Sequence, residues 1–149
     1  MAALASALAG HRLVVLDTSV WIYHFEGSTA YGRAADSVLE AITQRKVGAV
    51  ASELVLLELL VAPLKKGAQD IADEIELTLL HFPNLQLAPV TRAVLVRAAE
   101  IRGRYGVRTP DSIMLATAVE SGATLAVTND NAWQKMKEIE VLLVRDLKA

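Results

Sequence analysis

Residues 13–19 read Leu-Val-Val-Leu-Asp-Thr-Ser, an apolar run that ends in an acid and two hydroxyl residues. The β-branched valines and the polar boundary at Asp17 favour a short strand over residues 13–16. Four similar runs, bounded mostly by turn or polar residues, follow at residues 47–51, 85–88, 124–128 and 141–144. The sequence therefore predicts five short strands.

Longer segments between these runs carry apolar residues at the i, i+3 and i+4 spacing of an amphipathic helix. Pro63 is expected to end one of them, and Thr109 followed by a proline marks the start of another. The predicted helices cover residues 18–26, 29–44, 52–62, 68–80, 91–104 and 110–120, with a weaker segment at 131–137. Strands separated by helices predict an α/β fold with a parallel sheet of about five strands flanked by helices. We expect a single three-layer domain over residues 13–149, preceded by an irregular or helical extension at 1–12.

The composition narrows the class of protein. The 149 residues include no cysteine, which excludes a disulfide scaffold, a thiol nucleophile and zinc–thiolate or iron–sulfur sites. A hydrophobic content of 53% indicates a folded chain, and no apolar run reaches the roughly 20 residues that a bilayer span needs. We expect a cytoplasmic protein. The net charge of −2 disfavours binding of nucleic acid through overall positive charge.

Three aspartates fall at one edge of the predicted sheet. Asp17 follows the first strand, Asp130 follows the fourth, and Asp111 lies in the first turn of the helix after Thr109. The carboxyl ends of parallel strands share an edge, the crossover helices begin there, and ligands bind there. Each aspartate alone is well explained as a helix cap or a first-turn acid. Their coincidence at one edge favours a shared site.

Glu58 is the only charged residue between positions 54 and 64. On a helix it shares a stripe with Leu54, Leu57 and Val61, so we expect its side chain to be buried. A buried, unpaired carboxylate is costly and needs a compensating partner. That partner is either an arginine or lysine from another element, or a divalent cation that Glu58 shares with other acids.

The convergence of these four acids would favour a hard cation. Without metal, their repulsion should raise at least one pKa and couple the titrations. Carboxylate oxygens select Mg²⁺ or Mn²⁺ over zinc, and the three histidines show no ligand spacing. Such an ion suits phosphodiester hydrolysis, because it activates the attacking water and neutralises charge on the phosphate. The sequence shows no serine–histidine pair placed for covalent catalysis and no glycine-rich phosphate loop.

Four segments, each with one of these acids, resemble the PIN domain, and in particular the compact VapC toxins of toxin–antitoxin pairs. They read Val-Leu-Asp-Thr-Ser at 15–19, Ser-Glu-Leu-Val-Leu-Leu-Glu-Leu at 52–59, Thr-Pro-Asp-Ser-Ile-Met-Leu-Ala-Thr-Ala at 109–118 and Thr-Asn-Asp-Asn-Ala-Trp at 128–133. The resemblance spans residues 13–143 and rests on the order and spacing of the segments rather than on any one of them.

The resemblance implies an endoribonuclease that cleaves single-stranded RNA with Mg²⁺ or Mn²⁺, forms a homodimer and is silenced by an antitoxin protein. Carried over by position, the catalytic and metal-binding acids are Asp17, Glu58, Asp111 and Asp130, and the supporting polar residues are Thr18, Ser19 and Thr128. Helix capping accounts for each supporting residue equally well. Some family members carry a further acid near the third one, whereas here none lies between Asp111 and Glu120. That difference leaves one-ion and two-ion chemistry open.

Five arginines and a single acid lie within residues 92–108, directly before Asp111. Of these, Arg104 and Arg108 are candidate RNA phosphate contacts, although a solvated helix face with ion pairs explains them equally well. Three aromatic residues follow Asp17, and packing is the favoured interpretation over base stacking for Trp21, Tyr23 and Phe25. The apolar helices at 52–64 and 68–80 offer either a groove for a dimer or an antitoxin, or ordinary core.

Three other functions compete with the nuclease. A catalytically inactive PIN-like module would bind RNA or a protein, but it would have no need for Glu58 among apolar neighbours. A phosphatase of the haloacid dehalogenase type needs a second aspartate two residues after the first, where Ser19 stands. A receiver domain needs an aspartate after the third strand, where Ala88 and Pro89 stand.

Overall fold

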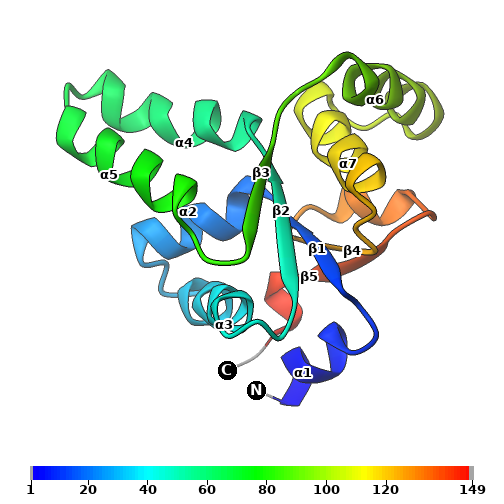
Figure 1. The fold of residues 1–149 in the computed structure, drawn as a ribbon, viewed down its shortest axis with the longest axis horizontal. Helices are drawn as coiled ribbons and strands as arrows, with labels where there is room; N and C mark the ends of the chain where they lie inside the picture. The colour runs from blue at the N-terminus through cyan, green and yellow to red at the C-terminus, as the bar shows by residue number, and fades with distance from the viewer. Residues whose placement is uncertain (1, 148–149) are drawn as a thin grey trace.

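The computed structural model describes residues 2–147 (Figure 1). Met1 of the predicted extension, and Lys148 and Ala149 of the predicted domain, lie outside the described residues. The strands are β1 (Leu13–Leu16), β2 (Gly48–Ser52), β3 (Leu85–Ala88), β4 (Leu125–Thr128) and β5 (Glu140–Leu143). The α-helices are α1 (Ala2–Leu8), α2 (Thr18–Glu26), α3 (Gly32–Thr43), α4 (Leu54–Lys65), α5 (Gln69–Leu80), α6 (Arg92–Tyr105) and α7 (Thr109–Ser121). Two short 3-10 helices, η1 (Asn131–Lys135) and η2 (Val144–Asp146), flank β5.

The strands form one parallel sheet in the order β3-β2-β1-β4-β5, which confirms the predicted α/β fold. The central strand is β1, where Val15 pairs with Val50 of β2 and with Ala126 of β4. The backbone N–H of Asp17 continues this pairing and donates to the carbonyl oxygen of Val127 at 3.0 Å. The ends of β1 and β4 therefore lie side by side at the carboxyl edge of the sheet.

Helices cover both faces of the sheet (Figure 1). On one face α7 packs on β1 and β2, and α6 packs on α7. On the other face α2 packs on β4 and against α3. The helices α4 and α5 form a hairpin that extends beyond the sheet, on the side away from α6 (Figure 1). Because both faces are covered, Val14, Val15 and Leu16 of β1 are completely buried.

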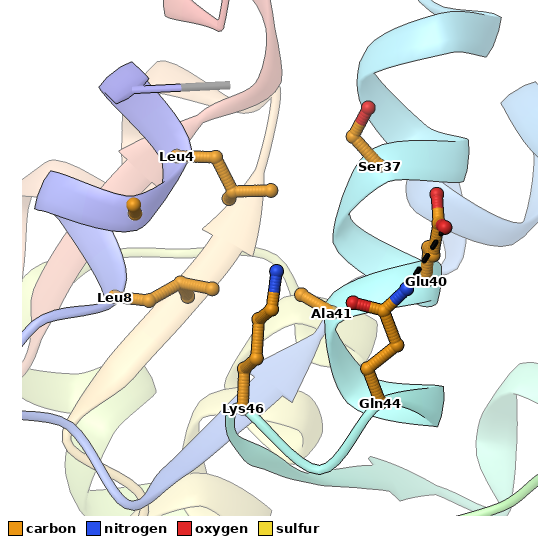
Figure 2. Close-up of a pocket in the computed structure, with 8 residues that line it drawn as sticks. Leu4, Leu8, Ser37, Glu40, Ala41, Gln44 and Lys46 are labelled. Atoms are coloured by element: carbon orange, nitrogen blue, oxygen red, sulfur yellow. Dashed lines mark hydrogen bonds between the residues drawn. The ribbon is translucent and has the colours of Figure 1, made fainter.

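The N-terminal extension is helical where it is described. Leu4 and Leu8 of α1 are buried, and Figure 2 shows both side chains directed toward α3, with Lys46 rising between the two helices. A cavity of about 280 Å³ lies between α1 and α3. The helix α1 leads into the start of β1, so this cavity lies at the amino edge of the sheet, opposite the carboxyl ends of β1 and β4. Within residues 2–147, no helix is long and apolar enough to cross a membrane.

Pro63 does not end its helix, contrary to the prediction. The helix α4 runs on to Lys65 because Pro63 stands in its last turn, where the missing N–H removes only one helical hydrogen bond. Gly67 ends the helix instead, in the left-handed conformation at φ 72°. The backbone N–H of Ala68 then donates to the carbonyl of Pro63 at 2.9 Å, the pattern of a Schellman cap.

Candidate active site

A cleft of about 410 Å³ opens at the carboxyl edge of the sheet, and all four predicted acids line it. Asp17 follows β1, Asp130 follows β4, Asp111 lies in the first turn of α7, and Glu58 lies in the second turn of α4. The parallel sheet brings these elements together because strand ends and helix starts share one edge. The other residues that line the cleft are Thr18, Ser19, Ile22, Tyr23, Arg108 and Asn129.

Asp17 is held by three hydrogen bonds at the end of β1. Its Oδ2 accepts hydrogen bonds from the hydroxyl of Thr128 at 2.6 Å and from that of Ser19 at 3.2 Å, and its Oδ1 caps α2 by accepting from the Thr18 N–H at 2.8 Å. Burial raises the pKa of Asp17 to about 6, and the negative charge of Asp111 adds to this effect, against the lowering effect of the hydrogen bonds.

Glu58 is exposed, so the expectation that it is buried in an apolar stripe was wrong. The helix α4 buries Val55 and Leu59, while Leu57 is 61% and Val61 51% exposed. The α4–α5 hairpin extends beyond the sheet, and no layer covers that side of α4 (Figure 1) among the described residues. Glu58 nevertheless reaches the cleft, because its Oε1 accepts a hydrogen bond of 2.6 Å from the hydroxyl of Thr18, the neighbour of Asp17.

Asp111 and Asp130 complete the acidic lining. Asp111 is only 6% exposed, and its Oδ2 accepts a 3.1 Å hydrogen bond from Nε of the exposed Arg108. The hydrogen bond and charge of Asp111, with smaller contributions from Asp130 and Glu58, raise the pKa of Arg108. Asp130 caps η1 through the Ala132 N–H, and its own N–H donates to the Thr128 hydroxyl at 3.0 Å.

Arg104 lies elsewhere, so the structure separates it from the other candidate phosphate contact. Its guanidinium lies over the ring of Tyr105 and 3.5 Å from the carboxylate of Glu138. These partners line a different hollow, between α6 and the segment after η1. The alternative interpretation, a solvated helix face with ion pairs, therefore describes Arg104, whereas Arg108 stands in the cleft.

The donor set of the cleft fits a hard divalent cation in its chemistry. Four carboxylates share the cleft, and one of them is partly desolvated and repelled by another. Within residues 2–147, no three acids or histidines are yet arranged as ligands of one ion. Each of three acids is held by its own partner instead, Asp17 by Thr128, Glu58 by Thr18 and Asp111 by Arg108. A bound ion would supply the compensating positive charge that Arg108 gives to Asp111 in this structure, while the threonine hydroxyls would continue to hold Asp17 and Glu58.

Asn129 is a site residue that the sequence patterns did not indicate. Its side-chain Nδ2 donates to the hydroxyl of Tyr23 at 3.1 Å, and its Oδ1 accepts from the backbone N–H of Arg145 at 2.9 Å. The only signal was its position between Thr128 and Asp130, directly after a strand. Tyr23 is half-buried in the cleft, while Trp21 is completely buried, as the packing interpretation predicted.

The raised pKa of Asp17 predicts how the stability of the metal-free protein depends on pH. The carboxyl has an ordinary pKa of 3.8 in the unfolded chain and a pKa of about 6 in the folded one, so the folded state binds the proton more tightly. Between these values the free energy of unfolding should fall as the pH rises, by about 2 to 3 kcal/mol from this group. Urea titrations in chelator across this pH range measure how the free energy of unfolding changes with pH, and Asp17→Asn, which lacks the titrating carboxyl, is the control. Equal slopes for the two proteins would contradict the assignment.

Both the sequence and the fold have known relatives. The profile of the PIN domain family matches residues 14–139. A search of curated proteins gave no significant match. Solved structures with the same fold include VapBC2 from Rickettsia felis bound to a promoter DNA fragment, with a TM-score of 0.70 and 15% identity over 88% of this chain and 98% of that one.

Two further structures have the same fold. A toxin–antitoxin complex from Klebsiella pneumoniae has a TM-score of 0.66 and 21% identity, over 88% of this chain and 97% of that one. The VapC20 toxin of Mycobacterium tuberculosis, described as cleaving the sarcin-ricin loop, has a TM-score of 0.62 and 18% identity, over 76% and 86%. Identities this low show the likeness of fold alone. The family profile covers most of the chain, and the chain therefore belongs to the PIN domain family.

Proposed function

We propose that this protein is an endoribonuclease that hydrolyses phosphodiester bonds of single-stranded RNA with Mg²⁺ or Mn²⁺, and that it is the toxin of a toxin–antitoxin pair. The observation that carries the proposal is the gathering of Asp17, Glu58, Asp111 and Asp130 around one cleft. Nucleases of the PIN family usually use divalent metal ions, and the structures similar to this one include toxin–antitoxin complexes.

In this proposal the four acids would hold the metal ion, and the bound ion would lower the pKa of the attacking water and neutralise charge on the phosphate. The hydroxyls of Thr128 and Ser19 hold the Asp17 carboxylate in place, and Thr18 does the same for Glu58. These three residues are the supporting polar groups of the site. Arg108 is 78% exposed, so its side chain can leave Asp111 when a cation takes over that carboxylate, and can then contact a phosphate oxygen.

An antitoxin and a second copy of the chain are the protein partners that we propose. A groove of about 290 Å³ lies between α2, α4 and α5, with an apolar lining that includes Phe25, Leu59 and Ile75. It also includes Glu58, so an apolar segment in this groove would end at the acidic cleft. The helices α4 and α5 further expose Leu57, Val61, Leu64, Ile71, Leu77 and Leu80. Apolar exposure of this kind is typical of a surface that a partner covers.

Cleavage assays on a panel of single-stranded and structured RNAs, with Mg²⁺, with Mn²⁺ and with chelator, test the proposed activity. We expect cutting of single-stranded segments that chelator abolishes and that either ion restores. RNA binding without cutting under all three conditions would contradict the enzyme and support the alternative, a catalytically inactive PIN-like module that binds RNA or protein. Cutting that survives chelation would contradict the role of the metal.

A further inference from the structure

A second hollow lies beside the acidic cleft and has the opposite charge. This arginine hollow has a volume of about 580 Å³ and is lined by residues 28–31, Arg33 and Ala34 on one side, and by Val144, Arg145 and Leu147 on the other. Its lining therefore holds two arginines and, among the described residues, no acid. The neighbouring cleft holds four acids and one arginine.

Two direct contacts join the hollow to the cleft. The ring of Tyr31, in the hollow, lies 5.0 Å from the ring of Tyr23, in the cleft. Asn129, also in the cleft, accepts hydrogen bonds from the backbone N–H of Arg145 and, through its carbonyl, from Nη1 of the same residue at 3.1 Å. Asn129 also donates to the hydroxyl of Tyr23, so these two side chains form a ridge at the boundary between the two hollows.

Arg145 is held in place without losing its charge. Its guanidinium donates to the carbonyl of Asn129 and to the side-chain oxygen of Asn131, both of which are neutral acceptors. Arg33 is exposed on the first turn of α3. Within residues 2–147, neither arginine forms an ion pair with an acid, whereas Arg97, Arg104 and Arg108 all do. The hollow therefore presents positive charge that this part of the chain leaves uncompensated.

We propose that the arginine hollow is a binding subsite for single-stranded RNA, and that it holds nucleotides flanking the phosphate in the acidic cleft. This inference rests on the proposed function and adds the path of the strand. A strand that crosses the ridge between Tyr23 and Asn129 brings its next phosphates to Arg33 and Arg145, and Tyr31 offers a face on which a base stacks. Duplex RNA does not offer free base faces, so the subsite selects for single strands.

Binding rather than cleavage tests the subsite. Fluorescence anisotropy of a labelled single-stranded RNA dodecamer is measured in chelator, where no metal holds the strand in the acidic cleft. We expect Arg33→Ala to weaken binding on the order of fivefold and to reduce the slope of log affinity against log salt by about 0.7, the value for one phosphate contact of a single strand. Arg12→Ala removes the same charge at the amino edge of the sheet and is expected to change neither quantity.

Two further variants separate the contacts. Tyr31→Ala should weaken binding by about tenfold at an unchanged salt slope, while Tyr31→Phe keeps the stacking face and should bind like the wild type. Arg145→Lys keeps the charge but loses the hydrogen bonds to Asn129 and Asn131. If Arg145→Lys keeps the salt slope of the wild type and Arg145→Ala lowers it, Arg145 contacts a phosphate. Thermal unfolding of each variant checks that it is folded.

The outcomes distinguish this inference from the proposed function. The subsite would be wrong if Arg33→Ala bound RNA with the affinity and salt slope of the wild type. It would also be wrong if Arg12→Ala lost as much RNA affinity as Arg33→Ala. Either result would stand even if the protein cuts RNA. If Arg33→Ala weakened only the binding of a protein partner, the hollow would be a protein-docking surface and the RNA inference would be wrong. The expected losses in a protein that never cleaves RNA would sustain the subsite and leave the proposed activity wrong.

Discussion

Replacing Asp17 with asparagine is expected to lower metal-dependent RNA cleavage by at least about a hundredfold while the chain remains folded. Asparagine has the shape of aspartate and its oxygen can still accept from the Thr18 N–H, so the cap of α2 is kept. It lacks the negative charge that a Mg²⁺ or Mn²⁺ ion needs from its ligands. Cleavage assays measure the loss of rate, and calorimetric titration with Mn²⁺ measures the accompanying loss of metal affinity.

The control for this substitution is Asp70→Asn, which removes an exposed acid in the first turn of α5 and should leave both rate and affinity unchanged. The two measurements must also move together, because the carboxylate acts through the ion. A wild-type cleavage rate for Asp17→Asn would make the assignment of the cleft wrong. So would a lost rate with full Mn²⁺ affinity, which would place the metal elsewhere.

The second large effect is expected from Glu58→Gln, with a loss of cleavage of at least about tenfold and little change in stability. Glu58 is exposed, so its replacement should change the free energy of unfolding by no more than about 0.5 kcal/mol. Glutamine can accept the hydrogen bond from Thr18 and therefore keeps the position of the side chain while removing its charge. Cleavage rates and urea unfolding, measured side by side, give the two quantities.

Glu53→Gln is the matched control, since Glu53 is an exposed glutamate just before the same helix and its side chain caps nothing. It should match the wild type in both measurements. A large loss of stability in Glu58→Gln with unchanged Mn²⁺ affinity would show that Glu58 serves the fold rather than the metal.

The position of three of the acids could be predicted because it follows from chain connectivity. Once a strand ends at residue 16 and a parallel neighbour ends at residue 128, the residues after them must share an edge, and Asp17 and Asp130 do. Asp111 follows by the same rule, since a crossover helix begins where the strands end. No tertiary contact had to be known for any of these placements.

The environment of Glu58 could not be predicted in this way. The periodicity of residues 54–64 shows a helix that is apolar on nearly every side, but it does not show which side meets the sheet. In the structure the hairpin of α4 and α5 extends beyond the sheet, and much of that apolar surface is left exposed. Arg104 likewise pairs with Glu138, 34 positions away along the chain, and no local pattern indicates that contact.

The hydroxyl of Thr128 connects two acids whose synthesis is far apart in time. Asp17 emerges early from a ribosome, yet the group that holds its carboxylate follows 111 residues later, on a strand that must insert beside β1. A nascent chain that stops short of β4 lacks both this hydroxyl and Asp130. The segment that forms β4 must therefore be synthesised and inserted beside β1 before the cleft can assemble, so the site cannot form piecemeal from the N-terminal part of the chain.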